Sequence, residues 1–366
     1  MLIGKMNAPD PKGGRELLGK LNRDVLQSLY GSELVYIDLP ARNLKDIRGY
    51  LSAFRGHMDG LNAETIRSAL AIIDGESAEK VFLDGSNLGG IIPFIKRRRP
   101  AVEVITFFHN VEARFFWGSF LARRTPRALA VLMANYLAER KAVRGSDKIV
   151  CLSERDSRML KRLYGRGATH IAPMALEDQC PAELVAASGS KPERFALFVG
   201  GTFYANRDGI AWFVREVVPR IDLPLYIVGR GFEAMRAELE VPGKVVVVGA
   251  VDSLADWYRR ARFVIAPIFD GSGMKTKVAE ALMFGKKIIG TAEAFSGYED
   301  VAEGAGWCCA TADDFVAALA EAEAMELPEF DPALRALYEG QFSRAAACKR
   351  MAHILGIANP KNPSHT

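Results

Sequence analysis

The residues best suited to chemistry lie in one stretch, from Phe263 to Gly290 (FVIAPIFDGSGMKTKVAEALMFGKKIIG). An apolar run of the kind buried in parallel sheets precedes Gly271, Ser272 and Gly273, and a helical pattern follows them. At the start of a helix, backbone N–H groups lack intrahelical partners, the dipole is positive, and glycines let a ligand approach the backbone closely. The stretch therefore predicts an anion site at the start of this helix.

Two lysines and a glutamate follow the glycine loop. Lys275 and Lys277 are expected in the first helical turn, where cations oppose the helix dipole, so an anion is expected to offset them. Glu280, one turn beyond Lys277, could pair with that lysine or accept hydrogen bonds from sugar hydroxyls. An ordinary loop followed by a solvated helix face is the alternative interpretation.

Two further candidates lie in the first half of the chain. The run VEVITFFHN places His109 at the carboxyl end of a predicted strand, where open α/β sheets hold their ligand residues. A histidine at a strand end is also often a structural residue. The pair Gly13-Gly14 precedes an amphipathic helical pattern and is a second candidate anion loop, with Arg15 as a phosphate contact, although two glycines also suit a tight strand-to-helix turn.

These residues are positioned by strands and helices that alternate along the whole chain, which predicts an α/β fold. The 366 residues exceed what one hydrophobic core usually serves, so two domains are expected. No apolar run has the length of a membrane span, and the first residues lack a secretory hydrophobic region, which predicts a cytoplasmic protein. Strands are expected at Met1–Lys5, Glu33–Asp38, Lys80–Asp84, Val102–Asn110, Lys148–Leu152 and Phe263–Pro267, and the last helix at Ser343–Gly356.

Charge is distributed unevenly between the two halves. Residues 1–180 hold 28 Lys and Arg against 20 Asp and Glu, whereas residues 181–366 hold 20 against 24. The stretch Arg114 to Arg144 also sets aromatic residues beside arginines, as a membrane-surface contact requires, although a core helix with a charged end would look the same. The first domain is therefore the one expected to meet an anionic surface or acceptor.

The segment GSGMKTKVAEALMFGKKIIGT resembles the donor-binding signature of the GT-B nucleotide-sugar glycosyltransferases of the family 4 type, which act in bacterial polysaccharide and glycolipid synthesis. The resemblance implies that Lys275 and Lys277 contact the donor diphosphate and that Glu280 binds the nucleotide ribose. Many members carry a second glutamate at the position that Ser272 occupies here.

Other segments resemble the same family. The HNVE motif at His109 resembles the motif whose histidine approaches the transferred sugar. The pair Gly200-Gly201 resembles the glycines that let the donor phosphates approach, and Val251 lies in the loop that holds the nucleotide base.

The resemblance also implies two Rossmann-like domains facing across a cleft, with the last helix crossing back to the first domain. We expect an acceptor-binding domain at 1–180, a linker at 181–193, a nucleotide-sugar-binding domain at 194–340, and a returning helix and tail at 341–366.

The implied activity is transfer of a sugar from a nucleotide-diphosphate sugar to a saccharide or lipid-linked saccharide. The nucleotide-diphosphate sugar is a co-substrate, and no bound cofactor is expected. His109 is expected beside the anomeric carbon, with Asp84 or Glu112 as a candidate base. The sequence has no Asp-x-Asp pair to hold a metal-bound diphosphate, so no metal is expected. A sugar-nucleotide epimerase or hydrolase of the same fold, and a non-catalytic nucleotide-sugar-binding protein, remain the alternatives.

Overall fold

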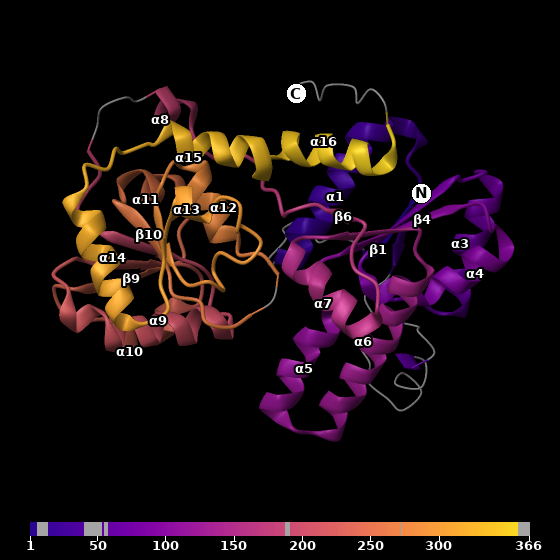
Figure 1. Cartoon of the computed structure of the whole chain (residues 1–366), viewed down its shortest axis with the longest axis horizontal. Helices are drawn as coiled ribbons and strands as arrows, with labels where there is room; N and C mark the ends of the chain where they lie inside the picture. The colour runs from indigo at the N-terminus through magenta and orange to yellow at the C-terminus, as the bar shows by residue number, and fades with distance from the viewer. Residues whose placement is uncertain (6–13, 40–52, 55–57, 187–190, 272, 358–366) are drawn as a thin grey trace. The chain divides into compact units, whose positions relative to one another are not determined.

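Two parallel β-sheets, each in its own structural unit, form the framework of the computed structural model (Figure 1). The structure describes residues 1–5, 14–39, 53–54, 58–186, 191–271 and 273–357. Unit 1 comprises Met1–Met174 and Ala347–Thr366, and unit 2 comprises Ala175–Ala346. The predicted α/β class with two Rossmann-like domains is confirmed.

The sheet of unit 1 has the strand order β2-β1-β3-β4-β5-β6, and every pairing is parallel. Its strands are β1 (Leu2–Lys5), β2 (Tyr36–Leu39), β3 (Lys80–Asp84), β4 (Glu103–Phe108), β5 (Lys148–Cys151) and β6 (His170–Ile171). Its α-helices are α1 (Gly14–Tyr30), α3 (Ala63–Gly75), α4 (Ile92–Arg98), α5 (Glu112–Arg123), α6 (Pro126–Gly145) and α7 (Glu154–Tyr164), and the 3-10 helix η2 spans Ser86–Ile91.

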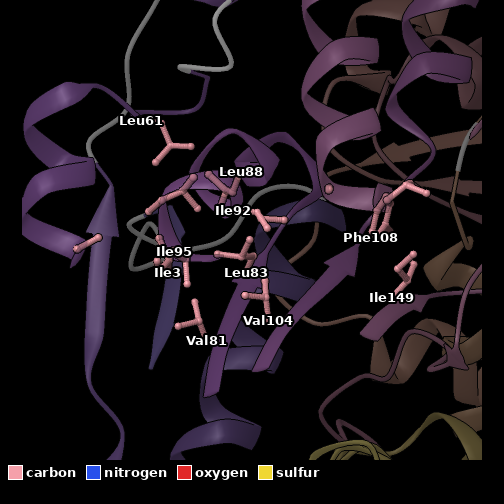
Figure 2. Close-up of a cluster of buried hydrophobic side chains, with 14 of the residues drawn as sticks. Ile3, Leu61, Val81, Leu83, Leu88, Ile92, Ile95, Val104, Phe108 and Ile149 are labelled. Carbon is pink, nitrogen blue, oxygen red and sulfur yellow. The ribbon is translucent and has the colours of Figure 1, made fainter. Parts of the chain in front are cut away.

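Apolar side chains from neighbouring strands and from the helices above them form the core of unit 1, as Figure 2 shows. Val81 pairs with Val104 across β3 and β4, and both are fully buried. Strands buried on both faces read as nearly continuous apolar runs, which is why the sequence pattern located them. Further members of this cluster are Ile3, Leu61, Leu83, Leu88, Ile92, Ile95, Phe108 and Ile149.

The sheet of unit 2 has the order β12-β11-β10-β7-β8-β9 and is also parallel throughout. Its strands are β7 (Ala196–Val199), β8 (Leu225–Val228), β9 (Val245–Gly249), β10 (Phe263–Ala266), β11 (Ile288–Gly290) and β12 (Gly306–Cys308). Its α-helices are α8 (Ala182–Ala186), α9 (Tyr204–Glu216), α10 (Arg236–Leu239), α11 (Ala255–Arg260), α12 (Thr276–Met283), α13 (Ala302–Ala305), α14 (Ala312–Ala324) and α15 (Pro332–Leu337), followed by a π-helical turn at Tyr338–Phe342. The segment expected to be a linker thus contains the short helix α8.

The last helix, α16 (Arg344–Leu355), begins in unit 2, and its residues from Ala347 onward belong to unit 1. Lysines at the start of two strands hold its end. Lys148 Nζ donates to the carbonyl of Ile354 at 2.7 Å, and Lys80 Nζ donates to the carbonyl of Leu355. Both cations face the negative end of the helix dipole, which fixes the end of α16 on unit 1.

Each sheet has one point at which the chain changes direction across it. In unit 1 the chain passes from β1 to β2 on one side, and β3 then adds on the other side of β1. In unit 2 the chain runs β7, β8, β9 in one direction, and β10 then adds on the other side of β7. Loops that leave neighbouring strands in opposite directions open a crevice at the carboxyl ends of those strands, where ligands of open α/β sheets bind.

Gly89 lets α6 pack directly on the 3-10 helix η2 in unit 1. A Cβ added at Gly89 would lie 2.3 Å from the carbonyl oxygen of Ala138 and 2.5 Å from the amide nitrogen of Ala142. These are backbone atoms inside a helix, so they cannot move aside singly. The close approach holds the body of α6 against η2.

We expect Gly89→Ala to lower the free energy of unfolding by about 1–3 kcal/mol, because the methyl group forces α6 away from η2. Gly118→Ala is the matched control: it lies within α5, and nothing lies within 4 Å of an added Cβ. There alanine should raise stability by about 0.5–1 kcal/mol through helix propensity. Thermal unfolding followed by circular dichroism measures both, and a Gly89→Ala protein as stable as the parent would refute the packing argument.

Candidate active site

In unit 2, the crevice between β7 and β10 is lined by glycine backbone. A Cβ at Gly200 would lie 2.8 Å from Asn206 Nδ2 and 3.4 Å from Lys277 Nζ. A Cβ at Gly229, after β8, would lie 1.7 Å from the carbonyl oxygen of Gly200. Only glycine allows these strand ends to approach so closely, and Gly201 continues the loop by accepting a hydrogen bond from Asn206 Nδ2 at 2.8 Å.

Lys277 supplies a buried positive charge at this crevice. Lys277 is only 5% exposed. Its Nζ donates to Asn206 Oδ1 at 2.6 Å and lies 4.5 Å from the centre of the Phe198 ring. Burial lowers the pKa of Lys277 to about 7; the charge of Glu280 opposes that shift, and the charge of Lys275 adds to it. Among the described residues, Asn206 is the one hydrogen-bond acceptor of an ammonium that can donate three times.

The glycine loop differs from the prediction in where the helix begins. The structure starts α12 at Thr276, with Lys275 as its N-cap, so the expectation that the helix begins at the glycines is wrong. Gly271 has φ +142° and Gly273 has φ +66°, and neither value is compatible with a right-handed helix. Ser272, between them, lies outside the described residues.

Lys275 stabilises the loop from inside. Its Nζ donates to the carbonyl of Gly273 at 2.9 Å and to Glu293 Oε1 at 2.8 Å, while the hydroxyl of Tyr298 donates to the carbonyl of Lys275 at 2.9 Å. Lys275 therefore already has a carboxylate partner. Of Lys275 and Lys277, it is Lys277 whose ammonium has no carboxylate in contact among the described residues.

Glu280 is held by a tyrosine rather than by Lys277. The hydroxyl of the buried Tyr258 donates to Glu280 Oε2 at 2.8 Å, and the Tyr258 ring stacks on Phe284 with ring centres 4.7 Å apart. Burial raises the pKa of Glu280, and hydrogen bonds from Tyr258 and Thr276 oppose that shift. The stacked ring fixes the orientation of the carboxylate.

The loop after β9 carries the residues expected to face a nucleotide base. Glu233 Oε1 accepts the amide hydrogen of Ala250 at 2.6 Å, and Glu233 Oε2 accepts that of Gly231 at 2.7 Å. Hydrogen bonds from backbone N–H groups, first that of Ala250, lower the pKa of Glu233. Gly249 has φ +86°, and Val251 follows it, half-buried. Sequence reasoning missed Glu233, which links the two loops.

In unit 1, the crevice between β1 and β3 holds a histidine–carboxylate pair. His109 Nε2 lies 2.7 Å from Asp84 Oδ1, and Asn22 Nδ2 donates to the same oxygen at 2.8 Å. His109 is 6% exposed, and its Nδ1 has no hydrogen-bond partner among the described residues. Burial works to raise the pKa of Asp84, but the contact with His109, the hydrogen bond from Asn22 and the charge of Arg15 together lower it. A carboxylate in this position fixes the orientation of the imidazole.

Arg15 enters the same crevice as the second residue of α1, directly after Gly14, while Gly13 lies outside the described residues. Arg15 forms an ion pair with Asp59, which Asn87 Nδ2 also contacts at 2.8 Å. Burial favours a higher pKa for Asp59, but the charges of Arg15 and Lys5 and the hydrogen bonds from Asn87 and Arg15 lower it to about 2.

Asp59 has φ +48°, a left-handed conformation that few non-glycine residues adopt. It was missed by sequence reasoning, because the loop that contains it has no periodic pattern.

Glu112 is the first residue of α5 and is buried beside this cluster. Burial raises its pKa, whereas the charges of Arg15 and His109 lower it and that of Asp59 raises it, so these groups act on one another. The predicted residues Asp84, His109, Glu112 and Arg15 are thus brought together at one sheet edge.

A second buried glutamate holds the start of α5. Glu139, on α6, accepts the amide hydrogens of Glu112 at 2.9 Å and Ala113 at 3.1 Å, and the Tyr164 hydroxyl donates to it at 2.7 Å. Burial raises the pKa of Glu139 to about 7. A carboxylate at a helix N-terminus caps its unpaired N–H groups, so Glu139 positions Glu112.

Residues 193–324 match the family described as glycosyl transferases group 1. This domain belongs to the group 1 glycosyltransferases. No curated protein matches the chain in a sequence search. The predicted resemblance is confirmed, and the enzyme class with it.

Solved structures show that the fold of this glycosyltransferase extends over nearly the whole chain. Sucrose-phosphate synthase from Thermosynechococcus elongatus superposes with a TM-score of 0.67 at 15% identity, over 97% of each chain. The apo lipopolysaccharide outer core galactosyltransferase WaaB gives 0.63 at 13% identity, over 97% of this chain and 98% of that one. Anabaena Alr3699/HepE, solved in complex with UDP and glucose, gives 0.62 at 10% identity, over 97% and 99%. The protein therefore has the GT-B fold.

The glycosyltransferase domain contains a second buried lysine, Lys286, whose contacts are purely structural and can be compared with those of Lys277. Lys286 is 1% exposed, and burial lowers its pKa to about 7, as for Lys277. Its Nζ donates to the carbonyls of Arg259 at 2.9 Å and Ala261 at 2.7 Å, which ends α11. Lys286 thus satisfies backbone oxygens, whereas Lys277 faces the crevice.

We expect Lys277→Met to raise the free energy of unfolding at pH 7 by about 1–4 kcal/mol, because it removes a buried charge that lacks a compensating carboxylate. The folded pKa of about 7 lies below the ordinary 10.5, so the unfolded chain binds more protons between these values. The free energy of unfolding of the parent therefore rises as the pH rises from about 7 towards 10.5. The difference in free energy of unfolding between Lys277→Met and the parent becomes smaller over the same range.

Lys286→Met is the matched control and should destabilise the protein, since it leaves two carbonyls without their donor. Urea unfolding from pH 6 to pH 9 measures both variants. A Lys277→Met protein that is less stable than the parent at pH 7 would show that this lysine is structural as well.

Proposed function

We propose that this enzyme transfers a sugar from a nucleotide-diphosphate sugar to a saccharide or lipid-linked saccharide, with the donor bound by unit 2 and without a metal ion. The observation that carries the proposal is the buried ammonium of Lys277 beside the glycine backbone of Gly200. A nucleoside diphosphate would supply the negative charge and the acceptors that this ammonium lacks among the described residues. The HepE structures solved with UDP and with UDP-glucose support the same ligand class.

The donor contacts follow from the crevice of unit 2. Backbone at Gly200 and Gly201, together with Gly271 and Gly273, would approach the diphosphate, and Lys277 would meet its charge. Glu280, oriented by Tyr258, would accept hydrogen bonds from the ribose. The loop at Val251 would face the base. These groups are already in place before the reaction, so they can stabilise the diphosphate as it leaves.

The acceptor contacts would come from unit 1. His109, oriented by Asp84, would act beside the anomeric carbon, and Glu112 or Asp84 would accept the acceptor proton in an inverting reaction. Arg15 places a cation in the same cluster, which suits an acceptor that carries phosphate or carboxylate. The two sets of residues lie on different units, so variants in each should fail differently.

We expect Glu280→Gln to lower the affinity for UDP, ADP or GDP, whichever the enzyme binds, by about tenfold to a hundredfold. The reason is the loss of a charge-assisted hydrogen bond to the ribose. Lys277→Ala should lower the affinity for the nucleoside diphosphate much more than the affinity for the nucleoside. His109→Ala should leave diphosphate affinity nearly unchanged while transfer collapses. Calorimetry with the three diphosphates, run in EDTA, and a transfer assay on the same samples measure this.

Several outcomes would contradict the proposal. Binding that is lost in EDTA and restored by Mg²⁺ would exclude the metal-free mechanism. Unchanged affinity in Glu280→Gln would remove the donor assignment, and unchanged transfer in His109→Ala would remove that residue from the active site. Donor turnover without acceptor would favour an epimerase or hydrolase, and binding without any turnover would favour a non-catalytic protein.

We also propose that unit 1 associates with anionic membrane surfaces through the hairpin of α5 and α6, which lie side by side (Figure 1). Large apolar side chains on this hairpin are exposed, among them Trp117 at 51% and Leu121 at 47%. Arg123 and Arg124 stand at the turn between the helices. Apolar side chains beside cations suit the interface of an anionic bilayer. No helix in the described ranges is long and apolar enough to cross a membrane.

The double variant Trp117→Ser/Leu121→Ser should bind vesicles of phosphatidylglycerol and phosphatidylcholine about tenfold more weakly than the parent, because it loses apolar area buried in the interface. Leu163→Ser, a single substitution of an exposed apolar residue outside the hairpin of α5 and α6, should bind as the parent does. Parent binding should fade as salt is added. Vesicle sedimentation measures this binding, and a parent protein that does not bind the vesicles at low salt would refute the proposal.

A further inference from the structure

A pocket of about 460 Å³ lies in unit 2 beside the glycine loop, and none of its lining residues is among those assigned to the donor. Tyr204, Asp208 and Trp212 form one wall and follow one another at four-residue intervals along α9. Residues at this spacing lie on one face of a helix. Phe269 and Asp270, in the loop after β10, form the opposite wall.

The two walls are held together by a close backbone approach. A Cβ at Gly209 would lie 1.8 Å from the carbonyl oxygen of Pro267, so α9 rests directly on the end of β10. The Tyr204 hydroxyl donates to Asp270 Oδ2 at 3.3 Å, and Asp270 Oδ1 accepts the amide hydrogen of Gly271 at 2.7 Å. The pocket is therefore part of the folded unit and is preformed.

Aromatic rings are exposed at and next to this pocket. Phe269 is 46% exposed and meets Trp212 with ring centres 4.5 Å apart at 74°. Tyr204 is 39% exposed and meets Phe203, itself 51% exposed, with ring centres 4.4 Å apart. Exposed rings that line a concave site mark a binding surface rather than a core.

Carboxylates accompany these rings. Asp208 and Asp270 both line the pocket, together with one cation, Arg215. Asp208 has a side chain 62% exposed and pairs with Arg207, which lies on the same turn of α9. The pocket thus combines apolar ring surfaces with hydrogen-bond acceptors that face water.

We propose that this pocket binds a saccharide, as a second carbohydrate site separate from the donor site. A pyranose ring presents C–H groups on one face, which pack on aromatic rings, and hydroxyls around its edge, which donate to carboxylates. The acidic second half of the chain, with 24 Asp and Glu against 20 Lys and Arg, disfavours an anionic lipid as the occupant. The site would hold part of an acceptor or product chain near the glycine loop, and in this respect the inference rests on the proposed function.

The test uses the full-length protein and four uncharged probes: maltotetraose, cellotetraose, chitotetraose and mannotetraose. Saturation-transfer NMR and calorimetry measure their binding with and without saturating UDP, ADP or GDP. We expect at least one tetrasaccharide to bind, and to bind equally well when the diphosphate is present. Phe269→Ala should weaken that tetrasaccharide by about threefold to tenfold, through loss of the aromatic contact.

Asp208→Asn provides a second variant that does not touch the packing of the rings, and it should weaken the tetrasaccharide to a similar degree. Met325→Ala, at another exposed apolar residue of unit 2, is the matched control and should bind as the parent does. Circular dichroism confirms that each variant is folded. Diphosphate affinity should be the same in all of them.

The outcomes separate this inference from the proposed function. If diphosphate binds but none of the four tetrasaccharides does, the second site is refuted and the donor assignment stands. The same holds if the variants bind the tetrasaccharide unchanged, or if diphosphate displaces it. If a tetrasaccharide binds through Phe269 and Asp208 while no diphosphate binds, the donor assignment fails and the saccharide site stands. Binding of peptides or of neutral lipid vesicles in place of the tetrasaccharides would assign the pocket to a different partner.

Discussion

A buried ammonium with one hydrogen-bond acceptor among the described residues is the constraint on which unit 2 depends. Transfer of Lys277 from water to the end of β7 is costly, and the pKa of about 7 expresses that cost. The fold tolerates it because Asn206 accepts one hydrogen bond and the Phe198 ring faces the charge. Under the proposed function, an anion bound beside Lys277 would recover the remaining cost. The same side chain would then destabilise the unliganded protein and stabilise its complex with the donor.

The surrounding glycines serve this charge. Gly200 leaves room for both Asn206 and Lys277, and Gly229 lets the next strand end approach the carbonyl of Gly200. A Cβ at Gly200 would lie 3.4 Å from the ammonium of Lys277, and one at Gly229 would overlap the carbonyl oxygen of Gly200. Lys275 and Glu293 have a different part: their ion pair keeps the glycine loop in place next to α12. The two lysines, similar in sequence, thus have different roles because only one has a carboxylate in contact.

Unit 1 differs from unit 2 in the sign of its buried charge, because carboxylates rather than an ammonium are buried at its crevice. Asp84, Asp59, Glu112 and Glu139 are all largely buried, and each is balanced in its own way. His109 and Asn22 contact Asp84, Arg15 pairs with Asp59, and backbone N–H groups of α5 meet Glu139. For Glu112, as for Glu139, burial dominates and raises the pKa. A buried carboxyl group with a raised pKa, close to a histidine and an arginine, is a candidate for proton transfer.

The sequence by itself determined the features that depend on near neighbours in the chain. The apolar run at Lys80–Asp84 predicted β3 with its observed bounds, because a strand buried on both faces requires that pattern. The glycine loop at Gly271, the pair Gly200-Gly201 and the position of His109 at a strand end were also readable, since each is a local pattern.

Only the tertiary structure decided which partner each charged group has. Asn206 lies 71 residues from Lys277, Asp59 lies 44 residues from Arg15, and Tyr258 lies 22 residues from Glu280. The sequence also did not predict that α12 begins at Thr276, because the positive φ angles of Gly271 and Gly273 are set by the packing of their loop. Contacts between distant segments arise from how the strands order themselves in each sheet, and no pattern within a few residues encodes that order.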